Sequence, residues 1–183
     1  MSLFQPNYTF LSYREVSPAF LSAQGIKFLL LDIDNTLAPY EQPEPDDSIK
    51  QWLESLKAAG ICAAFLSNNH GERVELFSKT LGIPVRYDAH KPLPRRAKRL
   101  LAELGATKQN AALMGDQIFT DVLCAHLSGI RAILVPPIVD RTDAGTRFKR
   151  RMERGILKRY YKKNREATDI RVGSPLTKEH IKQ

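Results

Sequence analysis

Short runs of apolar residues alternate along this chain with longer segments in which apolar residues recur every three or four positions. A run of about four to eight mostly apolar residues, bounded by turn-forming residues, is typical of a buried β-strand. Such runs lie at 27–33, 61–66, 110–115 and 131–135, and a weaker one lies at 83–87. We therefore predict that these segments form the strands of one sheet.

The segments between these runs have the spacing of amphipathic helices. One begins at Asp47 or Ser48 and ends at Gly60, a residue type that often follows a helix. Further helices are predicted within 74–82, 92–104 and 118–127. Because strands and helices alternate, right-handed crossovers and a parallel sheet follow. The predicted fold class is α/β, a Rossmann-like three-layer α/β/α sandwich with a mainly parallel sheet.

Two carboxylates follow the first apolar run directly. Phe28-Leu-Leu-Leu leads into Asp32-Ile-Asp34, and ligands of open α/β sheets bind just beyond the carboxyl ends of such strands. Taken alone, an Asp after a strand is more often a turn residue or a helix cap. Other strand ends and loops also carry polar groups, namely Ser67-Asn-Asn69, Lys91 before Pro92, and Gly115-Asp116 followed by Thr120 and Asp121.

In this order, the polar groups resemble the four motifs of the haloacid dehalogenase superfamily of phosphohydrolases. The motifs are Asp-x-Asp-x-Thr from Asp32, a strand-terminal Ser67, Lys91, and Gly-Asp-x-x-x-Thr-Asp ending at Asp121. Their details look most like the YqeG-type phosphatases of subfamily IIIA, which are bacterial relatives of a mitochondrial phosphatidylglycerophosphate phosphatase. The likeness extends from roughly Tyr8 to Tyr161.

The resemblance implies roles for the acids. Asp32 would be the nucleophile that forms an aspartyl-phosphate, and Asp34 would act as general acid and then as general base. A phosphate ester repels an anionic nucleophile, so cations must first neutralise its oxygens. Mg²⁺, which prefers oxygen ligands, is the expected cofactor. We expect Asp32, Asp116 and the backbone carbonyl of Asp34 to bind it.

The remaining motif residues would bind phosphate or support the metal. Ser67 and the backbone N–H of Asn68 would hold phosphoryl oxygens, and Lys91 would neutralise phosphoryl charge and orient Asp32. Asp121 would support the magnesium shell directly or through water. Ser67 and Lys91 have simpler alternatives, because Ser67 could cap a helix and a lysine is usually solvated. Thr36, also part of the first motif, is expected to stabilise the turn of that motif rather than to react.

Length and composition agree with one domain. The chain has 183 residues, 43% of them hydrophobic, which is enough for one sizeable core. We assign residues 1–165 to this domain and expect 166–183 to be a flexible tail. Cys62 and Cys124 are predicted to be buried reduced thiols, which fits a cytoplasmic protein. No signal peptide or transmembrane span is expected from the amino-terminal residues.

Spacing between the motifs bears on substrate size. Thirty positions separate Leu37 from Ser67 and 23 separate Ser67 from His90. Predicted strands and helices already occupy both intervals, so we predict a capless site. An open site favours a phosphate on a large substrate, such as a membrane lipid, a nucleic-acid end or a protein, because the substrate must itself help to exclude water.

Positive charge is concentrated near the carboxyl end. Residues 141–165 hold eleven Lys and Arg against two acids, whereas the whole chain has a net charge of +8. A basic amphipathic helix is predicted at about 146–163, with contacts to an anionic membrane or another polyanion through Arg150, Arg151, Arg154 and Lys158. Alternatively, its apolar stripe packs on the domain and its cations are solvated, or the cations bind RNA or DNA.

The resulting hypothesis is a magnesium-dependent phosphatase that converts phosphatidylglycerophosphate into phosphatidylglycerol at the inner face of a bacterial membrane. The expected partners are a phosphorylated substrate, an anionic phospholipid, and a membrane surface to which the protein binds peripherally. Two alternatives are a phosphatase acting on a nucleic-acid end or small phosphoester, and a non-catalytic basic module that binds RNA or the ribosome. The sequence does not indicate an oligomeric state.

Overall fold

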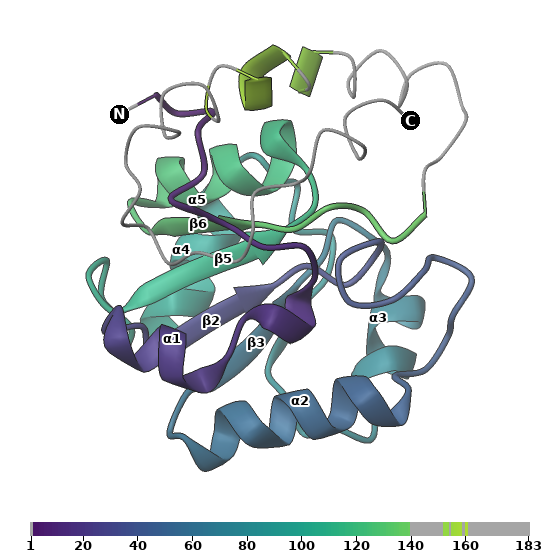
Figure 1. Ribbon diagram of the computed structural model, residues 1–183. Coiled ribbons are helices and arrows are strands. Elements are labelled where there is room, and N and C mark those ends of the chain that lie inside the picture. Colours follow the sequence, from purple (N-terminus) through teal and green to yellow (C-terminus); the bar gives the residue numbers. More distant parts are fainter. Residues whose placement is uncertain (1, 140–151, 154, 159, 161–183) are drawn as a thin grey trace.

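A six-stranded parallel sheet forms the centre of the protein (Figure 1). The computed structural model describes residues 2–139, 152–153, 155–158 and 160. The strands lie in the order β1-β6-β5-β2-β3-β4, and every neighbouring pair is parallel. Their bounds are β1 Tyr8–Thr9, β2 Phe28–Leu31, β3 Cys62–Leu66, β4 Val85–Arg86, β5 Ala111–Gly115 and β6 Arg131–Leu134. The parallel sheet and the strands expected from the apolar runs are confirmed.

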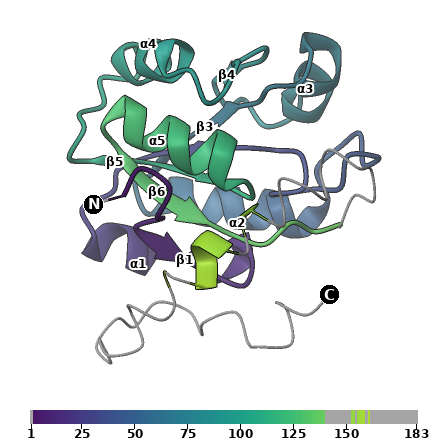
Figure 2. The same cartoon turned by 90° about the horizontal axis from the view of Figure 1, so that it is seen from above.

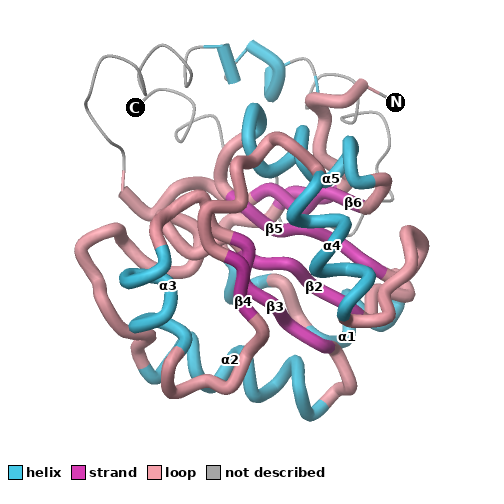
Figure 3. Tube along the Cα trace, turned by 180° about the vertical axis from the view of Figure 1, so that it is seen from behind, coloured by secondary structure: helices cyan, strands magenta, loops and turns pink. Residues whose placement is uncertain are grey.

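Helices cover both faces of the sheet, giving three layers (Figure 2). One face packs against α1 (Pro18–Ala23), α2 (Asp47–Ala58) and α3 (Gly71–Ser78). The other face packs against α4 (Arg95–Glu103) and α5 (Leu123–Ser128), which cross the strands in the view from behind (Figure 3). Side chains of β2 alternate between the two cores, with Leu29 and Leu31 in the first and Leu30 in the second. The α/β sandwich is therefore as predicted.

The helix boundaries follow from local chemistry. Asp46 caps α2 by accepting a hydrogen bond from the backbone N–H of Ile49 at 2.9 Å. The helix stops before Gly60, whose φ of +74° lies in the left-handed region. Hydrogen bonding from Ile49 is the main cause that lowers the pKa of Asp46. Asp46 therefore remains ionised and stabilises the start of the helix down to acidic pH.

Two short elements were not predicted from the sequence. β1 is only two residues long and α1 only six, so neither has room for a clear periodicity. Phe10 and Tyr13 in this amino-terminal segment are buried in the first core. Cys124 is buried as predicted, but Cys62 is only half-buried because it begins a strand at the edge of the core.

The interval between β2 and β3 contains one loop and α2, and the interval from β3 to α4 contains α3 and β4. In the described residues, neither interval contains a cap domain. Within the part of the chain that the structure describes, no inserted domain covers the carboxyl edge of the sheet, where β2 and β5 end.

Candidate active site

Three buried aspartates meet at the carboxyl edge of the two central strands. Asp32 directly follows β2 and Asp116 directly follows β5, and these strands pair so that Leu31 lies opposite Met114. Asp121 comes from the helical turn after β5, η2 (Ile118–Val122). One carboxylate oxygen from each aspartate lies within 4.8 Å of the others. The pairing of two parallel strands therefore brings together acids that are far apart in sequence.

Lys91 joins two of these carboxylates. Its Nζ donates to Asp32 Oδ1 at 2.6 Å and to Asp121 Oδ1 at 2.6 Å. The lysine side chain is only 2% exposed, so Lys91 is not the solvated lysine that its residue type alone would suggest. Burial by itself would lower the pKa of Lys91, but the adjacent carboxylates of Asp121 and Asp32 raise it above its usual value. Lys91 therefore stays charged.

The electrostatics of Asp32 show an excess of negative charge. Burial raises the pKa of Asp32 to about 8, and the carboxylates of Asp121 and Asp116 act in the same direction, while Lys91 opposes them. One ammonium thus faces three carboxylates in a buried site. Buried charge of this kind is stabilised by pairing or by a bound cation. The donor set, made only of oxygen atoms, fits a divalent metal ion such as Mg²⁺.

The position of Asp121 depends on a close approach of the chain. Its Oδ2 accepts hydrogen bonds from the backbone N–H of Gln117 and the hydroxyl of Thr120, each at 3.1 Å. A Cβ atom on Gly115 would lie 2.2 Å from Asp121 Cγ. Only glycine therefore leaves room for this carboxylate at position 115.

The same turn is supported by the carboxyl-terminal part of the chain. Glu153 is buried, and its Oε1 accepts a hydrogen bond from the backbone N–H of Ile118 at 2.8 Å. Ile118 begins η2, the turn that carries Asp121. A glutamate from outside the recognised motifs thus caps this turn, and no local pattern in the sequence indicated it.

Thr36 lies next to the proposed nucleophile. The chain turns at Asn35, which has a left-handed φ of +62°, a conformation that Asn tolerates better than most residues. This turn directs the Thr36 hydroxyl back to Asp32, where it donates to Oδ2 at 3.3 Å. Thr36 and Lys91 together contact both carboxylate oxygens of Asp32, so the side chain is held in one orientation.

Ser67 and Asn68 lie where β3 ends. Ser67 is buried and its Oγ accepts a hydrogen bond from the backbone N–H of Asn69 at 3.0 Å. Asn68 has a role that the sequence did not reveal, because its side chain bonds both backbone polar groups of Lys91. Its Oδ1 accepts from the Lys91 N–H at 2.6 Å and its Nδ2 donates to the Lys91 carbonyl at 3.0 Å. Asn68 therefore fixes the loop that carries the buried ammonium.

Asp34 is more exposed than Asp32 and is held by two residues that the sequence analysis did not assign to the site. Arg73 in α3 donates from Nε to Asp34 Oδ1 at 2.8 Å, and Asn69 donates from Nδ2 to Oδ2 at 3.3 Å. The exposed fraction of the Asp34 side chain is 21%, against 9% for Asp32. A single arginine in an amphipathic helix resembles a solvated surface residue, so no sequence signal distinguished Arg73.

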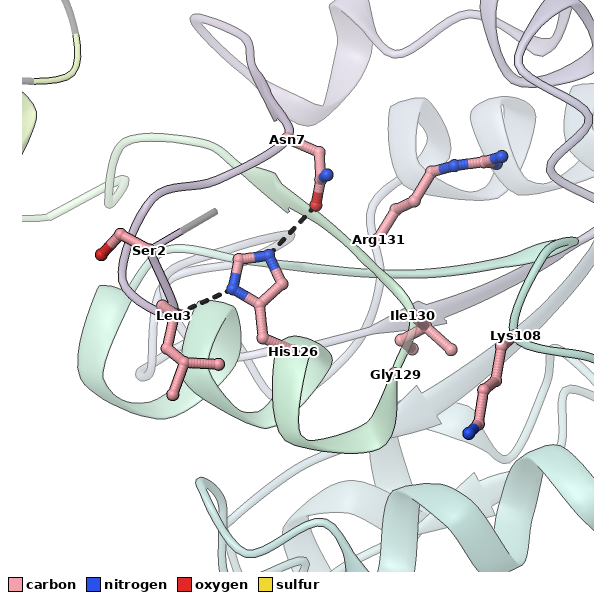
Figure 4. Close-up of a pocket in the computed structure, with 8 residues that line it drawn as sticks. All are labelled: Ser2, Leu3, Asn7, Lys108, His126, Gly129, Ile130 and Arg131. Atoms are coloured by element: carbon pink, nitrogen blue, oxygen red, sulfur yellow. Dashed lines mark hydrogen bonds between the residues drawn. The ribbon is translucent and has the colours of Figure 1, made fainter.

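A cavity of about 310 Å³ lies away from these carboxylates (Figure 4). It is lined in part by His126 at the end of α5 and by Arg131, the first residue of β6. It therefore lies at the amino edge of the sheet, opposite the aspartates. His126 contacts the Leu3 carbonyl and the Asn7 side-chain oxygen there, through hydrogen bonds of 2.8 and 3.2 Å. This cavity is separate from the candidate active site.

Part of the predicted basic helix lies within the described residues. Residues 152–153, 155–158 and 160 are helical, Ile156 and Leu157 pack against the second core, and Lys158 is exposed. Arg150, Arg151 and Arg154 lie outside the described residues. Packing of part of the apolar side on the domain agrees with one of the alternatives above. Among the described helices, none has both the length and the apolar character needed to span a membrane.

Comparisons with known proteins agree with the site. Residues 11–135 match the family described as haloacid dehalogenase-like hydrolase. The probable phosphatase YqeG of Bacillus subtilis (strain 168) is 37% identical over 142 residues, which cover 78% of this chain and 83% of that protein. Phosphatidylglycerophosphate phosphatase 1, chloroplastic/mitochondrial, of Arabidopsis thaliana is 27% identical over 190 residues, covering 94% of this chain and 52% of that protein.

A solved structure shares the fold. An uncharacterised protein from Listeria monocytogenes serotype 4b has a TM-score of 0.51 and 20% identity, covering 64% of this chain and 85% of that one. The parallel sheet, with a carboxylate cluster at its carboxyl edge, places the protein in the α/β class. More specifically, the chain belongs to the haloacid dehalogenase-like hydrolase family, and within it the chain is similar to the probable phosphatase YqeG.

Proposed function

We propose that this protein is a magnesium-dependent phosphomonoester hydrolase that forms an aspartyl-phosphate on Asp32. The observation that carries the proposal is the placement of the Asp32 carboxylate, which lies 2.6 Å from the buried ammonium of Lys91 and beside Asp116 and Asp121. A carboxylate held between a fixed cation and a metal-binding cluster can approach a phosphate ester without strong repulsion.

In the first step, a carboxylate oxygen of Asp32 attacks phosphorus and the bond from phosphorus to the leaving oxygen breaks. Asp34, in its protonated form, gives its proton to the departing alkoxide. The greater exposure of Asp34 supports this role, because the leaving group must reach the open side of the site. The products of the step are the free alcohol and the aspartyl-phosphate.

In the second step, Asp34 as a carboxylate removes a proton from water, and the water oxygen attacks phosphorus. The bond between phosphorus and the Asp32 oxygen breaks, which releases inorganic phosphate and restores Asp32. Asp34 regains the proton that it gave away in the first step. The two steps together consume one water molecule per ester.

Three groups of the chain would hold the phosphoryl oxygens. The Ser67 hydroxyl and the backbone N–H of Asn68 would donate to them, and Lys91 would neutralise their charge. Asp32, Asp116 and the Asp34 carbonyl would hold Mg²⁺, with Asp121 supporting it directly or through water. A bound Mg²⁺ would supply further neutralisation of phosphoryl charge.

For the substrate we propose phosphatidylglycerophosphate, with phosphatidylglycerol as the product. The name of the Arabidopsis relative supports this choice, although this chain spans about half of that protein. The open carboxyl edge of the sheet supports it as well, because a lipid headgroup presented by a bilayer can reach such a site. The membrane surface would then take over part of the water exclusion that a cap provides.

Exposed apolar side chains on loops at the same edge support contact with a bilayer. Each follows the carboxyl end of a strand and is 37–63% exposed: Tyr40, Tyr87, Leu93, Ile138 and Val139. Leu93 is the most exposed of the five and comes two residues after Lys91. Aromatic and aliphatic side chains at the rim of a site favour the interfacial region of a membrane.

Cations near this rim would attract an anionic surface. Arg95, Arg96 and Lys98 in the first turns of α4 are exposed, and each cation near an anionic membrane contributes roughly 1 kcal/mol of attraction. The predicted contacts of Arg150, Arg151, Arg154 and Lys158 would add to it. We propose peripheral binding at the cytoplasmic, inner face of a bacterial membrane.

Substrate choice is tested by phosphate release with Mg²⁺ from phosphatidylglycerophosphate and from phosphatidic acid in identical mixed micelles, with p-nitrophenyl phosphate as a soluble ester. The proposal predicts the highest kcat/KM for phosphatidylglycerophosphate, and loss of activity on all three in Asp32→Asn. Equal rates on the two lipids would retain the phosphatase but contradict the proposed substrate.

A further inference from the structure

Arg73 makes an ion pair with the proposed acid-base residue from a neighbouring helix. Its Nε and Nη2 both lie 2.8 Å from Asp34 Oδ1. The exposed fraction of the Arg73 side chain is 16% and that of Asp34 is 21%. The pair is therefore shielded from much of the screening that weakens ion pairs at the surface.

The same guanidinium also binds the loop that follows the first motif. Nη1 donates to the Gln42 carbonyl at 2.9 Å and Nη2 to the Pro39 carbonyl at 3.2 Å, and the guanidinium carbon lies 5.0 Å from the centre of the Tyr40 ring. All three guanidinium nitrogens thus have partners within the protein. Arg73 is therefore better suited to fixing protein groups than to binding the substrate.

The second oxygen of Asp34 is held as well. Asn69 donates to Asp34 Oδ2 at 3.3 Å, and the Asn69 Oδ1 accepts from the backbone N–H of His70 at 2.8 Å, which orients the amide. A carboxylate with partners on both oxygens has little freedom to rotate. The contacts that determine this orientation come from the first turn of α3 and the loop before it.

We infer that Arg73 is a positioning residue for proton transfer by Asp34, an inference that rests on the proposed function. Arg73 holds the Asp34 carboxylate toward the leaving oxygen and anchors it to the 39–42 loop. Without Arg73, Asp34 keeps its chemistry but loses its fixed orientation. Proton transfer to the leaving group is then slowed, whereas attack by Asp32 is unchanged.

Leaving groups of different acidity separate this role from a merely structural one. Phenol, like the tyrosine side chain, has a pKa of about 10, so phenoxide needs a proton as it departs, whereas p-nitrophenolate is stable without one. The two phosphate esters are close in size. The quantity to compare is kcat/KM, because it reports the steps up to departure of the leaving group.

The experiment measures kcat/KM for phenyl phosphate and p-nitrophenyl phosphate in the full chain, in Arg73→Gln, in Asp34→Asn and in the double variant. We expect Arg73→Gln to lower kcat/KM about 10- to 100-fold for phenyl phosphate and no more than about threefold for p-nitrophenyl phosphate. In the Asp34→Asn background, Arg73→Gln should cause little further loss, because both changes remove the same proton transfer. Lys79→Gln at the other end of α3 is the matched control.

Equal losses on the two esters, or losses that multiply in the double variant, would overturn the inference and leave Arg73 as a structural anchor of the 39–42 loop. Absence of activity in the unsubstituted chain on both esters and on phosphatidylglycerophosphate would instead overturn the proposed function, and the inference with it. The inference would also be overturned if the ratio of kcat/KM for the two esters were the same in Arg73→Gln as in the unsubstituted chain.

Discussion

The ammonium of Lys91 lies 2.6 Å from the carboxylate of Asp32, although 59 residues separate the two in sequence. Both side chains are almost fully buried, and the other contact of Lys91 is to Asp121 at 2.6 Å. One cation therefore links the proposed nucleophile to the carboxylate cluster. The contact between Lys91 and Asp32 therefore contributes both to the stability of the site and to the proposed chemistry of Asp32.

Removing the Lys91 cation should destabilise the protein, and the effect should be largest when no divalent ion is bound. Lys91→Met leaves the buried carboxylates without their ammonium, and breaking a buried ion pair costs about 3–5 kcal/mol. We expect the free energy of unfolding, measured in urea with EDTA, to fall by about this amount. Mg²⁺ should restore part of the loss, while phosphatase activity stays low.

Lys108→Met is the control for this variant, because Lys108 is exposed and lies at the amino edge of the sheet. It should change stability by less than about 0.5 kcal/mol. A Lys91→Met protein as stable as the parent in EDTA would contradict the electrostatic description of the site.

A methyl group on Gly115 should displace Asp121. Its Cβ would lie 2.2 Å from Asp121 Cγ and 2.5 Å from Oδ2, so the carboxylate must move from its position beside Lys91. We expect Gly115→Ala to lower stability by about 1–3 kcal/mol and to weaken Mg²⁺ binding measured by isothermal titration calorimetry. Gly155→Ala, which meets nothing within 4 Å in a helical segment, should leave Mg²⁺ binding unchanged and should not lower stability, because alanine favours a helix over glycine. Unaltered Mg²⁺ affinity in Gly115→Ala would argue against a role for Asp121 in the metal shell.

The cap of α2 gives a dependence of stability on pH. Hydrogen bonding from Ile49 lowers the pKa of Asp46 in the folded state, so its contribution is present above the usual aspartate pKa and is lost as pH falls through the lowered value. Asp46→Ala should cost about 1 kcal/mol at pH 7. In urea unfolding, the difference between Asp46→Ala and the parent should shrink toward pH 3. If the difference in the free energy of unfolding grew on acidification, the pKa of Asp46 would be raised in the folded state, not lowered.

Membrane contact predicts a dependence on lipid charge. Binding to liposomes should rise with the fraction of anionic lipid and fall when Arg150, Arg151, Arg154 and Lys158 are all changed to Gln. A control with the same change of charge replaces four exposed lysines that precede strands, at the opposite edge of the sheet: Lys27, Lys57, Lys79 and Lys108. Sedimentation with vesicles should separate the two variants. Equal loss in both would indicate attraction by net charge alone.

Much of the fold could be predicted because its strands are buried on both faces. Such strands appear as continuous apolar runs, and the acids Asp32 and Asp116 appear where two of these runs end. Parallel pairing then brings the two acids together. The short elements β1 and α1 could not be predicted, because two and six residues are too few to show a period.

The contacts that orient the site were less accessible to sequence analysis. Arg73 reaches Asp34 from 39 positions away, and Glu153 reaches Ile118 from 35 positions away. Such pairs depend on where helices pack against the sheet, and neither residue belongs to a local pattern. The side-chain bridge from Asn68 to Lys91 was missed for the same reason.

The central claim is that Asp32 carries the phosphoryl group during turnover. Borohydride reduces an acyl phosphate to an alcohol, so quenching the enzyme during turnover with Mg²⁺ and phosphatidylglycerophosphate should convert Asp32 into homoserine, identified by peptide mass spectrometry. We predict homoserine at position 32 only when substrate and Mg²⁺ are both present. Steady phosphate release with no modification at position 32, or with modification of another carboxylate, would contradict the account.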